Sequence, residues 1–187
     1  MPVVVLVHGT AGVDSRNDFH RPALLDVRMG TFEVDFKTGV FTSGSNRPPM
    51  ATFQPWAFGA LMVLRADPRV DPKRIAIMGF SLGGHLSVAV ASRSVTARWL
   101  GPDQNGFAAH VGFYPVCKWL NQYFKASEPT GAPILILSGE KDSWGDGKTC
   151  ASFCEGQEHP IVETLSPNRT DAAAFKSRAA DWRRYRT

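Results

Sequence analysis

The residues best suited to covalent chemistry lie in the motif Gly79-Phe80-Ser81-Leu82-Gly83. Four apolar residues, 75–78, precede the motif and predict a buried strand, and residues 86–91 after it are compatible with a helix. A G-x-S-x-G sequence between a strand and a helix is typical of a nucleophile elbow, a sharp turn that lifts the serine hydroxyl into a cleft. We therefore predict that Ser81 is a nucleophile. The alternative is an ordinary tight turn in which the serine caps a helix.

A second segment supplies hydrogen-bond donors for such a nucleophile. The five apolar residues Val3–Val7 predict a buried strand that runs into His8-Gly9-Thr10-Ala11-Gly12. The backbone amides of an H-G-x-x-G loop can point at a developing oxyanion, and the first amides of the helix after the elbow can do the same. We expect the amides of Thr10 and Leu82 to form this oxyanion hole. His8 is expected to shape the loop, because the base follows the acid along the chain in enzymes with this motif.

Strands alternate with helices along the chain, which predicts an α/β fold with a mostly parallel sheet between layers of helices. The other expected strands are 31–36, 107–115, 133–139 and 160–165, and the other expected helices are 14–27, 51–66, 146–157 and 171–186. The apolar positions include Phe19, Leu24 and Leu25 in the first helix and Trp56, Ala60, Leu61 and Leu64 in the second.

Several polar and aromatic residues fall at the ends of the expected strands. Ligands bind beyond the carboxyl ends of the strands in parallel sheets, so Ser81 and Asp142 should share one site. Phe80, Phe113, Tyr114 and Trp144 indicate an apolar substrate pocket beside them. His110 lies within an expected strand, and we interpret it as a core histidine and not as a ligand.

The composition places the chain among globular proteins. With 43% hydrophobic and 20% charged residues, the 187-residue chain can bury a core, and we expect one domain over residues 1–187. No apolar run reaches membrane-spanning length, and the first residues lack the basic segment and cleavage site of a signal peptide. We therefore expect no membrane partner and, by default, a cytoplasmic protein. The net charge of +4 is concentrated near the C-terminus and indicates a solvated helix face, with no nucleic-acid partner expected.

The three cysteines leave two interpretations open. None has the spacing of a zinc site, so we expect no metal and no organic cofactor. A disulfide between Cys117 and Cys150 is compatible with an exported protein, but the sequence does not decide whether it forms. Cys150 and Cys154, four residues apart, are expected to pack on one helix face.

The order of H-G-x-x-G, G-F-S-L-G-G and G-E-K-D-S-W resembles the α/β-hydrolase superfamily and, within it, the dienelactone hydrolase family. The resemblance extends from Pro2 to about Leu165. It implies an α/β-hydrolase fold in which Ser81 is the nucleophile and Asp142 orients a histidine. Two strands that precede H-G in the family are missing from this sequence, so the expected sheet has about six strands.

Two differences from the type members concern the reaction. They have Cys at the nucleophile position, where this chain has Ser81, and Glu where this chain has His8-Gly9. Both differences favour the serine-using, esterase-like branch of the family. The expected substrates are therefore small carboxylic esters or lactones other than dienelactone itself.

The histidine that the resemblance requires is not found at its expected position. The family has a segment like Y-P-G-A-x-H-x-F after the last strand. Alignment on Pro167 places Asp171 at the histidine, and alignment on Phe175 places Ala173 there. His159 is the one histidine after Asp142, but it precedes the last strand. His159 and Asp171 are therefore weak candidates for the general base, and a carboxylate with an ordinary pKa of about 3.9 suits a serine hydroxyl poorly.

Three functions follow from these features. The preferred one is a serine hydrolase that forms an acyl-enzyme on Ser81, with activity impaired by the missing histidine. The alternative is a non-catalytic relative that binds small esters, lactones or a protein; an exposed sheet edge would also favour a homodimer. The least favoured is a structural or nucleic-acid-associated domain that uses the basic C-terminal helix.

Overall fold

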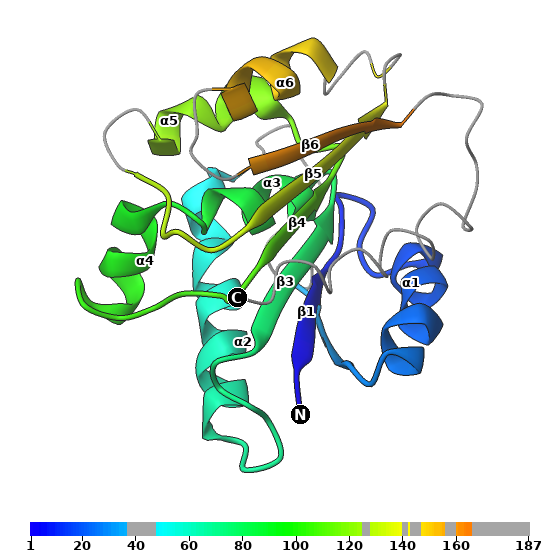
Figure 1. Ribbon diagram of the computed structural model, residues 1–187, viewed down its shortest axis with the longest axis vertical. Helices are drawn as coiled ribbons and strands as arrows, with labels where there is room; N and C mark the ends of the chain where they lie inside the picture. Colours follow the sequence, from blue (N-terminus) through cyan, green and yellow to red (C-terminus); the bar gives the residue numbers. More distant parts are fainter. Residues whose placement is uncertain (37–47, 125–127, 140–141, 143–146, 156–159, 166–187) are drawn as a thin grey trace.

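The computed structural model describes residues 1–36, 48–124, 128–139, 142, 147–155 and 160–165. These residues form a sheet of six parallel strands in the order β2-β1-β3-β4-β5-β6 (Figure 1). The strands are β1 (Val3–Val7), β2 (Gly30–Val34), β3 (Ile75–Phe80), β4 (His110–Phe113), β5 (Ile134–Gly139) and β6 (Pro160–Leu165). The predicted α/β fold with six strands is confirmed.

Helices cover both faces of this sheet. The described helices are α1 (Ser15–Asp26), α2 (Gln54–Ala66), α3 (Leu82–Ala89), α4 (Arg93–Leu100), α5 (Asn121–Phe124) and α6 (Gly147–Glu155), with short 3₁₀ turns η1 (Met50–Thr52) and η2 (Cys117–Trp119). α1 lies on one side of the sheet, and α2 and α3 lie on the other (Figure 1). α4 occupies a connection for which the sequence predicted no element, and the helix expected at 171–186 lies outside the described residues.

β1 shows why the strands are continuous apolar runs. Its five residues are all buried, because Val4 and Leu6 pack toward α1 while Val3, Val5 and Val7 pack toward α2 and α3. A strand covered by helices on both faces has no polar position, which explains the absence of alternation in its sequence.

The buried side of α1 does not coincide with its apolar residues. Leu24 is buried, but Phe19 and Leu25 are 62% and 54% exposed. The helix instead buries Asn17 and His20. Asn17 donates a hydrogen bond to Glu33 of β2, and the His20 ring stacks on Phe80 with a centroid distance of 5.4 Å. Contacts with residues of the sheet therefore allow these two polar side chains of α1 to be buried.

The apolar residues Ala60, Leu61 and Leu64 of α2 are buried. Trp56 of the same helix is 40% exposed. Trp56 instead lines an open groove of about 470 Å³ between α2 and β2, together with Phe32, Val34, Pro55, Gly59 and Val63 among others.

A disulfide joins Cys117 of η2 to Cys150 of α6, with a Cα–Cα distance of 5.0 Å. The structure thus decides the pairing that the sequence left open. Cys154 lies one turn further along α6, buried and with a free thiol, as expected for a packing residue.

The strand order identifies where a ligand should bind. β1 lies between β2 and β3, so the chain turns to one side after β1 and to the other side before β3. Such a topological switch point opens a crevice beyond the carboxyl ends of the two strands. The residues that follow β1 and β3 are Gly9 and Ser81 with their neighbours.

Candidate active site

Ser81 has a strained backbone. Its φ is 51° and its ψ is −110°, and it is one of three non-glycine residues with positive φ in the described part of the chain. Its amide donates to the carbonyl oxygen of Phe113 at 2.9 Å, and its carbonyl oxygen accepts from the amide of His85 at 2.8 Å. A bend of this kind between a strand and a helix is what a nucleophile elbow requires. Ser81 occupies the N-cap of α3 but makes no side-chain capping bond, which argues against the capping-serine alternative.

Glycines allow α3 to approach the sheet closely enough to form this bend. A Cβ on Gly79 would lie 2.4 Å from the carbonyl carbon of Gly83, and a Cβ on Gly83 would lie 2.3 Å from the carbonyl oxygen of Val7. Gly84 is equally close to β4, because its Cβ would lie 2.6 Å from the carbonyl oxygen of Phe113. The first turn of α3 therefore packs backbone against backbone on β1, β3 and β4.

The loop after β1 lies directly against the elbow. A Cβ on Gly9 would lie 3.2 Å from the carbonyl oxygen of Phe80 and 3.6 Å from the Cβ of Ser81. The amide of Gly12 donates to the carbonyl oxygen of Gly9 at 3.1 Å and closes the loop into a turn. The structure thus brings the predicted H-G-x-x-G loop and the predicted nucleophile together.

His8 holds this loop in place. Its ring is 2% exposed and stacks on Phe36 with a centroid distance of 4.0 Å. Nε2 lies 3.1 Å from the amide nitrogen of Phe36 and 3.2 Å from Oδ1 of Asp35, and Nδ1 lies 2.7 Å from the carbonyl oxygen of Gly9. These contacts join the ends of β1 and β2 and support a loop-shaping role for His8.

Arg16 is a site residue that the sequence analysis missed. Asp14 caps α1 by accepting from the Arg16 amide at 3.0 Å, and the Nε of Arg16 donates to the same carboxylate at 2.8 Å. These bonds lower the pKa of Asp14 to about 2. The Nη1 of Arg16 donates to the phenol oxygen of Tyr114 at 3.1 Å and lies 3.6 Å from where a Gly9 Cβ would be. The two residues are 98 positions apart, so no local pattern indicates the contact.

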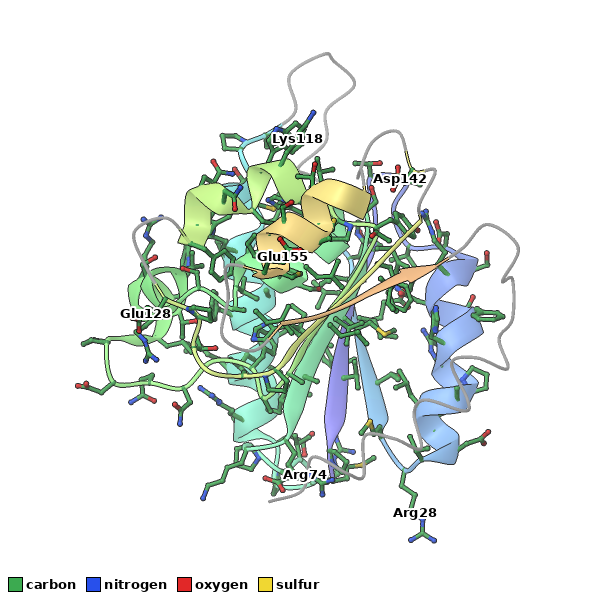
Figure 2. All side chains as sticks on the ribbon, turned by 45° about the horizontal axis from the view of Figure 1, so that its top comes forward. Arg28, Arg74, Lys118, Glu128, Asp142 and Glu155 are labelled. Atoms are coloured by element: carbon green, nitrogen blue, oxygen red, sulfur yellow. A yellow bond between two sulfur atoms is a disulfide. The ribbon has the colours of Figure 1, made fainter. Side chains whose placement is uncertain are left out.

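Asp142 follows β5 at the same end of the sheet. Figure 2 shows it at the carboxyl ends of the strands, opposite Arg28 and Arg74, which precede β2 and β3. Its amide donates to the carbonyl oxygen of Gly139 at 3.1 Å, and the residue is partly buried.

The predicted pocket residues separate into two groups. Phe80 is 3% exposed and Phe113 is 8% exposed, and the two rings stack with a centroid distance of 4.8 Å. Phe80 thus supports the elbow from the α1 side, and the expectation that it lines an open pocket is corrected. Tyr114 is partly buried, with a φ of 38°. Trp144, His159, Asp171 and Ala173 lie outside the described residues.

His110 is a core residue, as expected. It is fully buried, and its Nδ1 donates to the carbonyl oxygen of Ser87 in α3 at 2.7 Å. Burial lowers its pKa to about 4, so the ring is neutral at neutral pH.

The described residues hold neither a cluster of metal ligands nor a membrane-spanning helix. No three of their His, Cys, Asp and Glu side chains gather closely enough to hold a metal ion. None of their helices combines the length and apolar character needed to cross a membrane.

Comparison with known protein families identifies the family of this chain. The sequence model of the dienelactone hydrolase family matches residues 40–159, which is more than half of the chain. The chain belongs to the dienelactone hydrolase family. No curated protein matches the chain significantly.

Three similar solved structures share the fold of this family member. An esterase from Thermogutta terrifontis superposes with a TM-score of 0.65 at 18% identity, over 98% of this chain and 80% of the esterase. Est1E from Butyrivibrio proteoclasticus gives 0.72 at 11% identity, over 98% and 86% of the two chains. An alpha-beta serine hydrolase homologue from Coxiella burnetii gives 0.66 at 18% identity, over 98% and 82%. At these identities the likeness establishes the α/β-hydrolase fold.

Proposed function

We propose that this protein is a serine hydrolase that cleaves small carboxylic esters or lactones through an acyl-enzyme on Ser81. The observation that carries the proposal is the strained backbone of Ser81, with its φ of 51°, at the switch point of an α/β-hydrolase sheet. Strain of this kind persists where the surroundings hold it and is frequent at active sites. Membership of the dienelactone hydrolase family and the fold shared with esterases support the same conclusion.

The proposed reaction has two halves. The Oγ of Ser81 attacks the ester carbonyl carbon, its proton passes to a base, and the carbonyl electron pair moves onto oxygen, where the amides of Leu82 and Thr10 stabilise the charge. Collapse of this intermediate expels the alcohol, which takes up the proton. Water then attacks the acyl-enzyme in the same way and releases the acid. Asp142 orients the base, for which His159 and Asp171 are the candidates.

The proposed size of the substrate's acyl group comes from a protein of similar structure. Esterase 2 of Thermogutta terrifontis has been solved with propionate bound, with butyrate bound and phosphorylated by paraoxon. We therefore propose short-chain acyl groups as the first substrates to test.

The decisive experiment measures hydrolysis of nitrophenyl butyrate and labelling by a fluorophosphonate probe for the wild type, Ser81→Ala and Ser94→Ala. Ser94 lies on α4 and bonds to Ser92, so its variant is a matched serine control. Both signals should vanish in Ser81→Ala and persist in Ser94→Ala. Turnover that survives Ser81→Ala would refute the proposal. Tight ester binding without turnover or labelling would favour the alternative, a non-catalytic binding protein.

A second set of variants identifies the base. His159→Ala and Asp171→Ala are each compared with the wild type for hydrolysis and labelling. The alanine variant of the residue that accepts the proton should have a kcat lower by roughly 10³-fold or more. The other variant should keep a kcat close to that of the wild type. If Asp171 or Ala173 occupies the family's histidine position, Asp171→His or Ala173→His should raise turnover. No gain in either variant would contradict both alignments.

A further inference from the structure

The side chain of Arg16 joins the two strands that flank the nucleophile strand. Arg16 follows β1 and Tyr114 follows β4, and β3, which leads to Ser81, lies between these strands in the sheet. The hydrogen bond from Nη1 of Arg16 to the phenol oxygen of Tyr114 measures 3.1 Å. A guanidinium is therefore held across the carboxyl end of the strand that carries the nucleophile.

The guanidinium is also close to Ser81. The Nη1 of Arg16 and the Cβ of Ser81 each lie 3.6 Å from the point where a Gly9 Cβ would be, so they are separated by at most twice that distance. Residue 9 has no side chain, which leaves the space between them open. The side chains of Arg16 and Ser81 therefore border the same space beside Gly9.

Arg16 has hydrogen-bond donors to spare. A guanidinium carries five N–H groups. The described contacts use the hydrogen on Nε and one on Nη2 for Asp14, and one on Nη1 for Tyr114. This leaves one hydrogen on Nη1 and one on Nη2 without an acceptor among the described residues, and the one on Nη1 is on the Tyr114 side. The contacts to Asp14 fix the plane of the group, so this donor is oriented before a substrate arrives.

A surface ion pair does not account for this arrangement. A pairing of Arg16 with Asp14 alone would leave the guanidinium free to lie against solvent, as Arg69 does with Asp67, where the Arg69 side chain is 83% exposed. The Arg16 side chain is 36% exposed and is held against the loop after β1 by the additional bond to Tyr114.

We propose that Arg16 is a catalytic residue that donates, through Nη1, to the carbonyl oxygen that becomes negative when Ser81 attacks. This inference rests on the proposed function. As the bond from Oγ to the carbonyl carbon forms, the Ser81 proton goes to the base and the carbonyl electron pair moves onto oxygen. Arg16 stays protonated throughout and adds a charged donor to the amides of Leu82 and Thr10. Asp14 and Tyr114 act through Arg16 as positioning residues.

The test compares Arg16→Gln with Arg21→Gln. Both arginines lie on α1, both side chains are 36% exposed and both pair with a carboxylate, Arg21 with Glu33 at 2.9 Å. Each variant is assayed with nitrophenyl butyrate, which is neutral, and with the nitrophenyl monoester of glutaric acid, which is anionic. Thermal melts monitored by circular dichroism verify that both variants fold.

Arg16→Gln should lower kcat by about 10²-fold to 10³-fold on both substrates with KM nearly unchanged, as for the loss of one oxyanion donor. Labelling of Ser81 by a fluorophosphonate should slow by a similar factor, because its phosphoryl oxygen takes the place of the oxyanion. The kcat of Arg21→Gln should stay within about twofold of the wild-type value, because Arg21 is not proposed to donate to the oxyanion. Tyr114→Phe should lower kcat less than Arg16→Gln, since it removes the support and keeps the donor.

The outcomes separate this inference from the proposed function. A loss confined to the anionic substrate and to KM would mean that Arg16 binds a substrate charge, and it would overturn the inference. Unchanged kcat in Arg16→Gln, with an active wild type, would overturn the inference and leave the serine hydrolase intact. A wild type that neither turns over nor labels would overturn both.

Discussion

The carboxyl ends of β3 and β5 hold the proposed nucleophile and the proposed acid in different ways. At the end of β3, Gly79 and Gly83 let the backbones of α3 and the sheet meet closely beside Ser81, and the amide and carbonyl groups of Ser81 are both hydrogen-bonded. At the end of β5, Asp142 is partly buried and its amide donates to the carbonyl oxygen of Gly139. Main-chain packing thus fixes the position of Ser81, whereas the described backbone contact of Asp142 lies within its own turn.

The two sites also differ in which parts of the chain surround them. The contacts at Ser81 come from residues within a few positions of it and from the adjacent strands, which are buried on both faces. Beyond Asp142, the next described element is α6, and the Cys117–Cys150 disulfide joins that helix to η2. Substitutions near β3 should therefore change both the stability and the activity of the protein. Substitutions near β5 should change one of these properties more than the other.

Asp142→Asn should have the largest effect on the reaction and almost none on the fold. If the carboxylate orients the base, an amide leaves the geometry intact but removes the charge, and kcat should fall by about 10⁴-fold. The measurement is steady-state hydrolysis of nitrophenyl butyrate, with urea unfolding as the test of stability.

Asp103→Asn is the matched control, because Asp103 is exposed in the turn after α4. Its activity should equal that of the wild type. An Asp142→Asn enzyme with wild-type kcat would show that another group orients the base.

Gly83→Ala should have the largest effect on stability. Its Cβ would lie 2.3 Å from one main-chain oxygen and 2.6 Å from another, so the first turn of α3 must move away from β1. We expect a loss of about 4 kcal/mol or more in the free energy of unfolding, together with the loss of Ser81 labelling. Urea denaturation and fluorophosphonate labelling measure the two effects.

Gly59→Ala is the control for this substitution. Gly59 also lies in a helix, and its Cβ would meet no atom within 4 Å. Alanine there should stabilise the protein by about 0.5–1 kcal/mol. Equal effects at the two glycines would refute the packing account of the elbow.

Features with local causes could be predicted from the sequence. The apolar runs gave five residues of β1 without error, and the spacing of Gly79, Ser81 and Gly83 placed a turn where the structure has one. A buried strand needs apolar residues, and a helix that packs backbone against backbone on a strand needs glycines, so both leave a mark in the local sequence.

Features with distant causes could not be predicted. The bond from Arg16 to Tyr114 exists because β1 and β4 lie on either side of β3, and no local pattern contains the strand order. The burial of His20 likewise depends on the rings of Phe80 and Phe113 from two other strands. The sequence leaves the pairing of Cys117 with Cys150 open, because the pairing depends on the contact between η2 and α6.

Removal of the disulfide should weaken the β5 side of the site by a smaller amount. The bridge closes a loop with a sequence separation of 33, for which chain entropy gives about 3–4 kcal/mol. Cys117→Ser combined with Cys150→Ser should lower the free energy of unfolding by that amount in urea denaturation, and it should reduce turnover more than fluorophosphonate labelling of Ser81. Cys154→Ser retains the bridge and is the control. A double variant as stable as this control would contradict the prediction.

The smallest expected effect is the contribution of His110, which packs against α3, to the pH dependence of stability. Burial lowers the pKa of His110 from 6.5 to about 4 in the folded protein. The unfolded chain therefore binds a proton between these values that the folded protein does not bind. Stability should fall as the pH is lowered from 6.5 to 4, by roughly 3 kcal/mol at about 1.36 kcal/mol per pKa unit, and it should level off below pH 4.

His110→Asn isolates this contribution. An asparagine can still donate to the carbonyl oxygen of Ser87, but it does not titrate. Urea denaturation at pH 7, 5.5 and 4 should show a shallower decline for the variant than for the wild type. Some decline should remain, because burial also lowers the pKa of His20. Parallel curves for the two proteins would mean that the interior around Ser87 accepts a charged ring, and the packing of α3 against β4 would then be less rigid than the glycine contacts indicate.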